Sequence, residues 1–123
     1  MKLLLLKEPL TVFQVGALKD IDLAISPLNI SVTADEISVV APTSQVPAET
    51  LNREDGWQMF KIEGVLDFSL IGILSKISGI LAKEEISIFA LSTFNTDYIL
   101  VKSDKVNKAV QALNGNDFVV IHD

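Results

Sequence analysis

The second half of the chain carries a helix pattern followed by two strand patterns, and this order most restricts the possible folds. Apolar residues recur three or four positions apart, at Leu70, Ile73, Leu74, Ile77 and Leu81. That spacing places them on one face of an amphipathic helix, predicted over residues 69–83. Two segments rich in β-branched and aromatic residues follow, at 86–93 and 96–102. They predict two strands joined by a tight turn.

A second helix and two further strands complete the pattern. Apolar residues at Val106, Ala109, Val110 and Leu113 predict a helix, with Asp104 capping its start and Gly115 ending it. Residues 57–63 and 117–121 have the composition of strands. The resulting order, strand–helix–strand–strand–helix–strand, is that of a ferredoxin-like domain. We therefore predict an α+β fold, βαββαβ, whose antiparallel sheet carries both helices on one face.

An internal similarity predicts a second copy of this module. Residues 33–40 (TADEISVV) resemble residues 95–102 (NTDYILVK), so that Asp35 and Asp97 stand 62 positions apart. Two tandem modules, 1–56 and 57–123, follow from this repeat. A chance likeness between two β-hairpins is the alternative. The first module would be degenerate, because only short helices, near 12–18 and 46–53, are indicated there.

Composition excludes several classes of function. The 123 residues include no cysteine, which excludes disulfides and thiolate metal sites and fits a cytoplasmic protein. The net charge is −6, and the ten Lys and Arg residues are scattered, which argues against binding of nucleic acids or anionic membranes. The apolar run at 3–6 is too short for a signal peptide, and Asp67 and Lys76 interrupt the apolar stretch at 65–82. We therefore expect no membrane span.

Catalytic groups are scarce in this sequence. The only histidine, His122, stands next to the last residue, and without cysteine neither a Ser–His–acid set nor a Cys nucleophile is plausible. No metal-ligand spacing and no phosphate-binding glycine loop is evident. We predict a protein that is not an enzyme and that uses no metal or cofactor.

Three stretches of the second half resemble the ACT domain family. Residues 64–74 (GVLDFSLIGIL) place an acidic residue and a glycine at a helix start, and 79–88 (GILAKEEISI) end that helix before an Ile-Ser-Ile strand. Residues 89–101 (FALSTFNTDYILV) are similar to the tandem-ACT subgroup, which includes the CASTOR-type arginine sensors and small free-standing bacterial proteins. The resemblance covers roughly the C-terminal half. One departure is Glu85, where many ACT domains have glycine.

Two segments are the candidate ligand site. The backbone N–H groups at the predicted helix start are suited to a carboxylate, and the residues concerned are Asp67, Phe68, Ser69, Leu70, Ile71 and Gly72. For Asp67, the alternative to ligand binding is a role as the cap of the helix. For Gly72, the alternative is that it lets the helix pack tightly on the sheet. The second segment is the predicted turn with Thr93, Asn95, Thr96 and Asp97, where Asp97 is suited to an ammonium or guanidinium group. Ordinary turn chemistry is the alternative there.

The resemblance implies a regulatory protein that binds an amino acid or a similar small metabolite. The ligand would lie between two modules, within one chain or across a homodimer, and binding would shift a conformational population. A regulated partner enzyme is implied in general terms only. The alternative from a different class is a structural protein that dimerises through its sheet and binds no small molecule.

Overall fold

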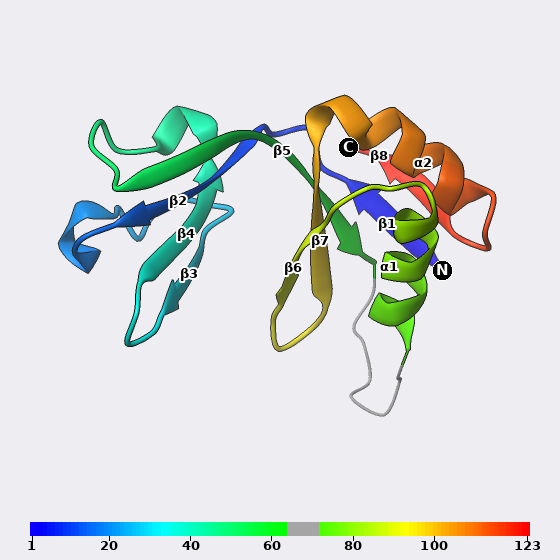
Figure 1. Cartoon of the computed structure of the whole chain (residues 1–123), viewed down its shortest axis with the longest axis horizontal. Coiled ribbons are helices and arrows are strands. Elements are labelled where there is room, and N and C mark those ends of the chain that lie inside the picture. Colours follow the sequence, from blue (N-terminus) through cyan, green and yellow to red (C-terminus); the bar gives the residue numbers. More distant parts are fainter. Residues whose placement is uncertain (64–71) are drawn as a thin grey trace. The chain divides into compact units, whose positions relative to one another are not determined.

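Two units make up the chain in the computed structural model, which describes residues 1–63 and 72–123 (Figure 1). The terminal unit, as we call it, joins Met1–Lys7 to Gln58–Asp123, and the inner unit is Glu8–Trp57. The sequence-based division at 56/57 had assigned the first seven residues to the other module. In the structure those residues form a strand of the terminal unit.

The terminal unit has the predicted mixed architecture. Its strands lie in the order β8-β1-β5-β7-β6, with β1 antiparallel to β5 and parallel to β8. Apart from β1, the chain runs strand–helix–strand–strand–helix–strand, so the predicted α+β, ferredoxin-like arrangement is confirmed. The described elements are β1 (Lys2–Leu5), the second half of β5 (Asn52–Ile62), α1 (Ile73–Lys83), β6 (Phe89–Ser92), β7 (Asp97–Lys102), α2 (Val106–Asn114) and β8 (Val119–His122).

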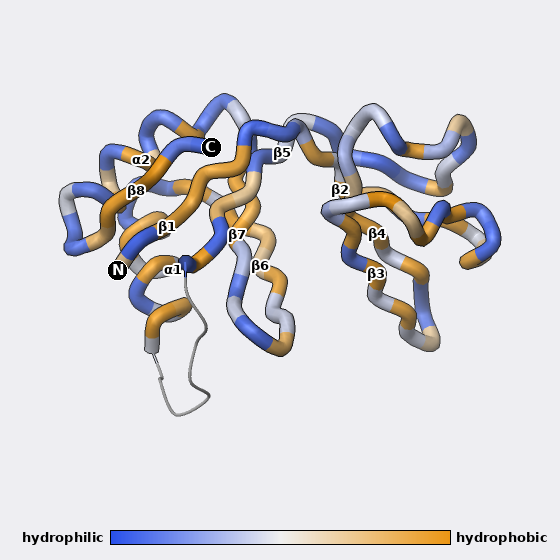
Figure 2. Tube along the Cα trace, turned by 180° about the vertical axis from the view of Figure 1, so that it is seen from behind, coloured by the Kyte–Doolittle hydropathy of each residue, from blue (hydrophilic) through white to orange (hydrophobic). Residues whose placement is uncertain are grey.

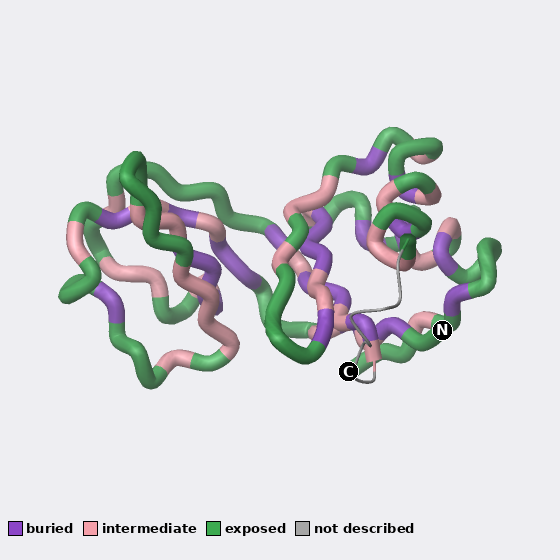
Figure 3. Tube along the Cα trace, turned by 90° about the horizontal axis from the view of Figure 1, so that it is seen from below, coloured by how far each residue is buried: buried purple, intermediate pink, exposed green. Residues whose placement is uncertain are grey.

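One face of this sheet is covered by both helices. Alternate residues of the central strands point to that face, because side chains along a strand alternate between its two sides. They meet Ile77 and Leu81 of α1 and Ala109 and Leu113 of α2 in one buried cluster, whose strand members include Leu3, Leu5, Phe60, Ile62, Ile99 and Val101. The apolar character of β1 is visible in Figure 2, and the buried stretches are purple in Figure 3. The helices are thus held by the apolar stripes that predicted them.

Helix α1 is followed by an acidic residue in a left-handed conformation. The N–H of Ile86 donates to the carbonyl of Leu81 (3.0 Å) and the N–H of Glu85 to that of Ala82 (3.0 Å), which is the bond pattern of a Schellman motif. Glu85 has φ 60° at the position where glycine is usual. Ile86 is 5% exposed and belongs to the same buried cluster as Leu81. This burial supports the motif despite the less favourable residue.

Helix α2 ends in a similar way but begins differently from the prediction. The N–H of Phe118 donates to the carbonyl of Leu113 (3.2 Å), and Asp117 between them has φ 73°. Gly115 follows the last helical residue, as predicted. The predicted cap by Asp104 is wrong: Asp104 lies inside a 3₁₀ turn, Ser103–Lys105, that leads directly into α2, and no side chain of the described residues caps the helix.

The inner unit keeps the order of strands and replaces the helices by loops. Its antiparallel strands are ordered β3-β4-β2-β5, the last being the first half of β5. Short helices predicted near 12–18 and 46–53 are wrong. Phe13 and Val15 belong to a strand and pack with Ile21, Val39 and Ala41 in the core of this unit. The described elements are β2 (Leu10–Val15), β3 (Asn29–Val32), β4 (Ile37–Pro42) and the 3₁₀ turns Leu18–Asp20 and Thr43–Gln45.

Strand β5 pairs with strands of both units. Its residues 52–57 pair with β2 and its residues 60–62 with β1. The pairing of β5 with β2 changes register at a bulge, because Leu10 opposes Trp57 but Val12 opposes Glu54. Gly56 has φ 84° at this bulge, a conformation that glycine adopts at little cost.

The internal repeat is present, with a spacing of 60 residues instead of 62. Strand β3 begins 60 positions before β6, β4 the same distance before β7, and the turn at Thr43–Gln45 the same distance before that at Ser103–Lys105. Asp97 therefore corresponds to Ile37 and not to Asp35. This common path supports the hypothesis that the inner unit is a second, degenerate module.

Candidate functional site

Gly72, which is the described residue of the first predicted segment, and the β6–β7 turn lie at one end of the terminal unit. Strand β5 ends there, α1 begins there, and the β6–β7 turn closes there (Figure 1). The hydroxyl of Thr96 donates to the carbonyl of Ile62 at 2.8 Å, and Thr96 is 4% exposed. This buried bond fixes the turn to the end of β5, directly before the connection to α1.

Five of the predicted residues, Asp67, Phe68, Ser69, Leu70 and Ile71, lie outside the described residues. Gly72 is described and has φ 85°, so a right-handed helix cannot run through it. The helix predicted from residue 69 therefore begins later, at Ile73. No heavy atom of the described residues lies within 4 Å of the place where a Cβ on Gly72 or Gly79 would stand. Tight helix packing therefore does not explain these two glycines.

The start of α1 has no side-chain cap among the described residues. The first helical bond runs from the N–H of Lys76 to the carbonyl of Gly72, at 2.8 Å. The N–H groups of Ile73, Leu74 and Ser75 precede that bond and have no partner within the helix. Together with the helix dipole, they give this end a partial positive charge that favours an anionic ligand group.

Within the β6–β7 turn, the polar residues divide into two kinds. Thr93 and Thr96 hold the turn, because the Thr93 hydroxyl donates to the Thr96 carbonyl (3.0 Å) and accepts from the Thr96 N–H (3.4 Å). The side chains of Asn95 and Asp97 form no hydrogen bond or ion pair with any residue that the structure describes. For the two threonines, turn chemistry is thus a sufficient explanation. It does not account for Asp97.

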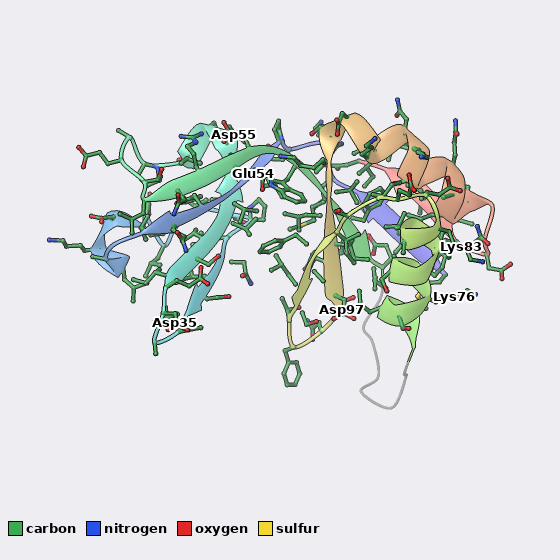
Figure 4. All side chains as sticks on the ribbon, viewed as in Figure 1. Asp35, Glu54, Asp55, Lys76, Lys83 and Asp97 are labelled. Carbon is green, nitrogen blue, oxygen red and sulfur yellow. The ribbon has the colours of Figure 1, made fainter. Side chains whose placement is uncertain are left out.

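Asp97 is half-buried and points to the helix-covered face of the sheet. It is the first residue of β7, and Ile99 and Val101, which share its face by strand alternation, are 1% and 0% exposed in the cluster that holds α1. Figure 4 shows its carboxylate at the end of β7. A carboxylate in this position is available to a cationic group that approaches from the same end of the unit.

The described residues contain neither a metal site nor a membrane span. They include no group of three or more His, Cys, Asp or Glu residues that could hold a metal ion. Of the helices in the described ranges, none is both long and apolar enough to cross a membrane.

Residues 52–115 match the sequence model of the ACT domain, which is more than half of the chain. The chain belongs to the ACT domain family. The matched stretch runs from the first residue of β5 to the residue after α2 and so contains both helices and the candidate site. Strands β1 to β4 and β8 lie outside it. Membership is therefore carried by the terminal unit and the shared strand.

The curated relatives are sensors much longer than this chain. The human and bovine cytosolic arginine sensor for mTORC1 subunit 1 are each 40% identical to it over 58 residues. The matched segment is 46% of this ACT chain and 18% of the sensor. The match thus spans only about a fifth of the sensor's length.

Solved structures extend the likeness to the whole ACT chain. A protein from Agrobacterium tumefaciens is 26% identical, with a TM-score of 0.87 over 99% of this chain and 92% of its own. Aspartate kinase from Clostridium acetobutylicum, described as an allosteric enzyme, is 15% identical, with a TM-score of 0.64 over 89% of this chain and 33% of its own. At this low identity, the likeness to the kinase shows a shared fold only.

Sequence reasoning missed one further hollow, which lies in the inner unit. It lies between the end of β2 and the β3–β4 turn, and its lining includes Gln14, Gly16, Asp35, Glu36 and Leu51. The internal repeat could have indicated this hollow, because the β3–β4 turn corresponds to the β6–β7 turn. A spacing of 62 residues instead of 60 aligns the two turns incorrectly.

Proposed function

We propose that this ACT protein is a non-catalytic regulatory protein that binds an amino acid at the end of the terminal unit. The observation that carries the proposal is Asp97, a half-buried carboxylate without a partner among the described residues. The curated relatives, which are arginine sensors, support an amino acid as the class of ligand. The Thr93–Thr96 turn would hold Asp97 in place.

The chemistry of this end suits a zwitterion. Asp97 offers a carboxylate to an ammonium or guanidinium group, and the N-terminus of α1 offers backbone N–H groups to a carboxylate. Gly72 has a left-handed backbone and no side chain, and no heavy atom of the described residues lies within 4 Å of where its Cβ would stand, so this part of the structure does not block those N–H groups. The groups offered by β7 and by the start of α1 are thus complementary to the two charged ends of an amino acid.

Regulation would follow from the two elements that the ligand joins. A ligand held by β7 and by the start of α1 stabilises the arrangement in which both are correctly placed, and so shifts the population toward it. We include in the proposal a cytoplasmic location, a homodimer and a regulated partner enzyme of unspecified identity. The sensing function of the curated relatives supports a regulatory role.

A structural role without a ligand is the second candidate. Strand β8 is an edge strand, paired only with β1 among the described strands, and Val119 and Ile121 on it are 56% and 39% exposed. Val119, Val120 and Ile121 include no charged residue or proline, the features that usually protect an edge strand from pairing with another. These features favour a chain that dimerises through its sheet.

A thermal-shift series with the full chain distinguishes the two candidates. Each amino acid is added at millimolar concentration to the wild type, to Asp97→Asn and to the matched control Asp104→Asn, which removes an equal charge from an exposed turn. At a ligand concentration of one hundred times Kd, binding adds about 2.7 kcal/mol to the free energy of unfolding. For a chain of this length that corresponds to a rise in Tm of roughly 10 °C.

We expect at least one amino acid to give a saturable rise in the wild type and in Asp104→Asn that Asp97→Asn lacks. A folded wild-type chain that responds to no amino acid would favour the structural role. A rise of equal size in Asp97→Asn would show that the ligand binds elsewhere.

A further inference from the structure

The hollow of the inner unit has a volume of about 330 Å³. It is formed entirely by residues of that unit, from the end of β2, from the β3–β4 turn and from Leu51. Asp35 marks its turn in Figure 4. A volume of this size is at the lower end of the range typical of small-molecule sites.

The place of this hollow in the fold corresponds to that of the candidate site in the terminal unit. The Thr33–Glu36 turn repeats the Thr93–Thr96 turn 60 residues earlier. The N–H of Thr33 donates to the carbonyl of Glu36 (3.0 Å), and the Thr33 hydroxyl accepts from the N–H of Glu36 (3.2 Å). In both units, the first strand of the module ends beside the turn between the second and third strands.

The walls of the hollow combine negative charge with apolar surface. The N–H of Asp35 donates to the Thr33 hydroxyl at 3.2 Å, and its carboxylate has no hydrogen-bond or ion-pair partner among the described residues. One oxygen of Glu36 accepts from the amide of Gln14 at 2.9 Å, and the amide of Asn52 donates to Gln14 at 2.7 Å. This chain of bonds orients Glu36 and leaves its second oxygen available. Apolar contact is offered by the remaining side chains, which include Val15, Ala34, Ile37 and Leu51.

No lysine or arginine lines the hollow. A zwitterionic amino acid would therefore place its carboxylate near two negative side chains with no cation to balance it. A metal ion is also poorly served, since the described residues contain no group of three or more metal-binding side chains. An organic cation meets both the charge and the apolar walls.

We propose that the inner unit binds a small organic monocation, a primary amine with a short apolar chain, in the hollow between the end of β2 and the β3–β4 turn. Asp35 and Glu36 accept hydrogen bonds from the ammonium group, and the apolar wall contacts the alkyl chain. This site is separate from that of the proposed function, and it selects an amine where the other selects an amino acid.

Gly16 provides a way to close the hollow without disturbing the fold. It lines the hollow, its φ lies outside the left-handed region, and a Cβ built on it would meet no atom within 4 Å. A leucine at this position adds a side chain to open space without backbone strain. Gly16→Leu is therefore the blocking variant, and Asp35→Asn is the charge variant.

The test is an NMR titration of the uniformly ¹⁵N-labelled full chain, in which the chemical shifts of the backbone amides are measured. The probe is n-butylammonium chloride. Sodium butyrate and 2-aminopentanoate are the controls, the first with the opposite charge and the second with an added carboxylate. We expect saturable shifts for n-butylammonium at residues 14–16 and 33–37, with binding at least about fivefold weaker in Asp35→Asn because a charge-assisted bond is lost. Gly16→Leu should abolish the saturable shifts.

Asp20→Asn removes the same charge from an exposed turn of the inner unit outside the hollow, and it should bind the probe as the wild type does. Asp97→Asn should also leave binding unchanged, so that failure here and failure of the amino-acid site are read separately. Equal shifts with 2-aminopentanoate, unsaturable shifts spread over the acidic surface, or unchanged binding in a folded Gly16→Leu chain would each overturn the proposal.

Discussion

Replacing Glu85 by glycine is expected to stabilise the chain. Glu85 has φ 60° in the Schellman motif that ends α1. A left-handed conformation costs a residue with a Cβ roughly 1–2 kcal/mol, and glycine is almost free of that cost. Glycine also loses more backbone entropy on folding, which offsets about 0.4–1 kcal/mol of the gain. The net expectation is an increase of about 0.5–1 kcal/mol in the free energy of unfolding.

The preceding residue supplies the matched control. Glu84 has φ −92°, a conformation open to any residue, so Glu84→Gly brings the entropic cost of glycine without relief of strain. Both variants remove one negative charge. Glu84 is 4.0 Å from the ammonium of Lys108, an exposed pair of little energetic weight.

Urea denaturation followed by circular dichroism measures both variants against the wild type. We expect the midpoint to rise for Glu85→Gly and to fall for Glu84→Gly, with similar m-values. If the two midpoints move together, charge and not backbone conformation sets the stability at this helix end, and the reasoning fails.

Two further substitutions test the contacts that position the site and the shared strand. Thr96→Val keeps the shape of the side chain but removes its bond to the carbonyl of Ile62, and should lower the free energy of unfolding by about 1–3 kcal/mol, whereas Thr93→Val in the exposed part of the turn should lower it less. Gly56→Ala forces a Cβ into the left-handed bulge and should destabilise by about 1 kcal/mol, whereas Gly79→Ala in the exposed part of α1 should stabilise by about as much. Urea midpoints are the measurement for both pairs.

The terminal unit was predictable because its helices have long apolar stripes. Residues 73–83 and 106–114 repeat the helical spacing over two to three turns. A pattern of that length arises by chance less often than one in a shorter segment. The strand predicted from residue 86 begins only at Phe89. Its first residue, Ile86, donates to the end of α1 instead of to a neighbouring strand, and apolar composition alone does not distinguish these two uses.

The candidate site was predictable in composition and not in detail. Four polar residues in the β6–β7 turn looked equivalent in sequence, but hydrogen bonds within the turn engage Thr93 and Thr96, and those two therefore do not need a ligand to explain them. Asp97 differs from them because it lies on the helix-covered face of β7 and because its carboxylate has no partner among the residues that the structure describes. Both are properties of the folded chain.

The spacing of the internal repeat shows what a strand pattern can and cannot determine. Side chains alternate along a strand with a period of two, so a shift of two residues keeps every residue on its own face and preserves the apolar pattern. A spacing of 62 therefore aligned Ile37 with Ile99. The first residues of β4 and β7 instead align Ile37 with Asp97. The turns resolve this ambiguity, because the Thr33 and Thr93 hydroxyls accept from the N–H three residues later and so fix one position in each copy. With the copies aligned on those threonines, the carboxylate of the terminal unit stands in β7 and that of the inner unit in its turn. The two units thus keep one backbone path and place their negative charge differently, which is why we expect them to select different ligands.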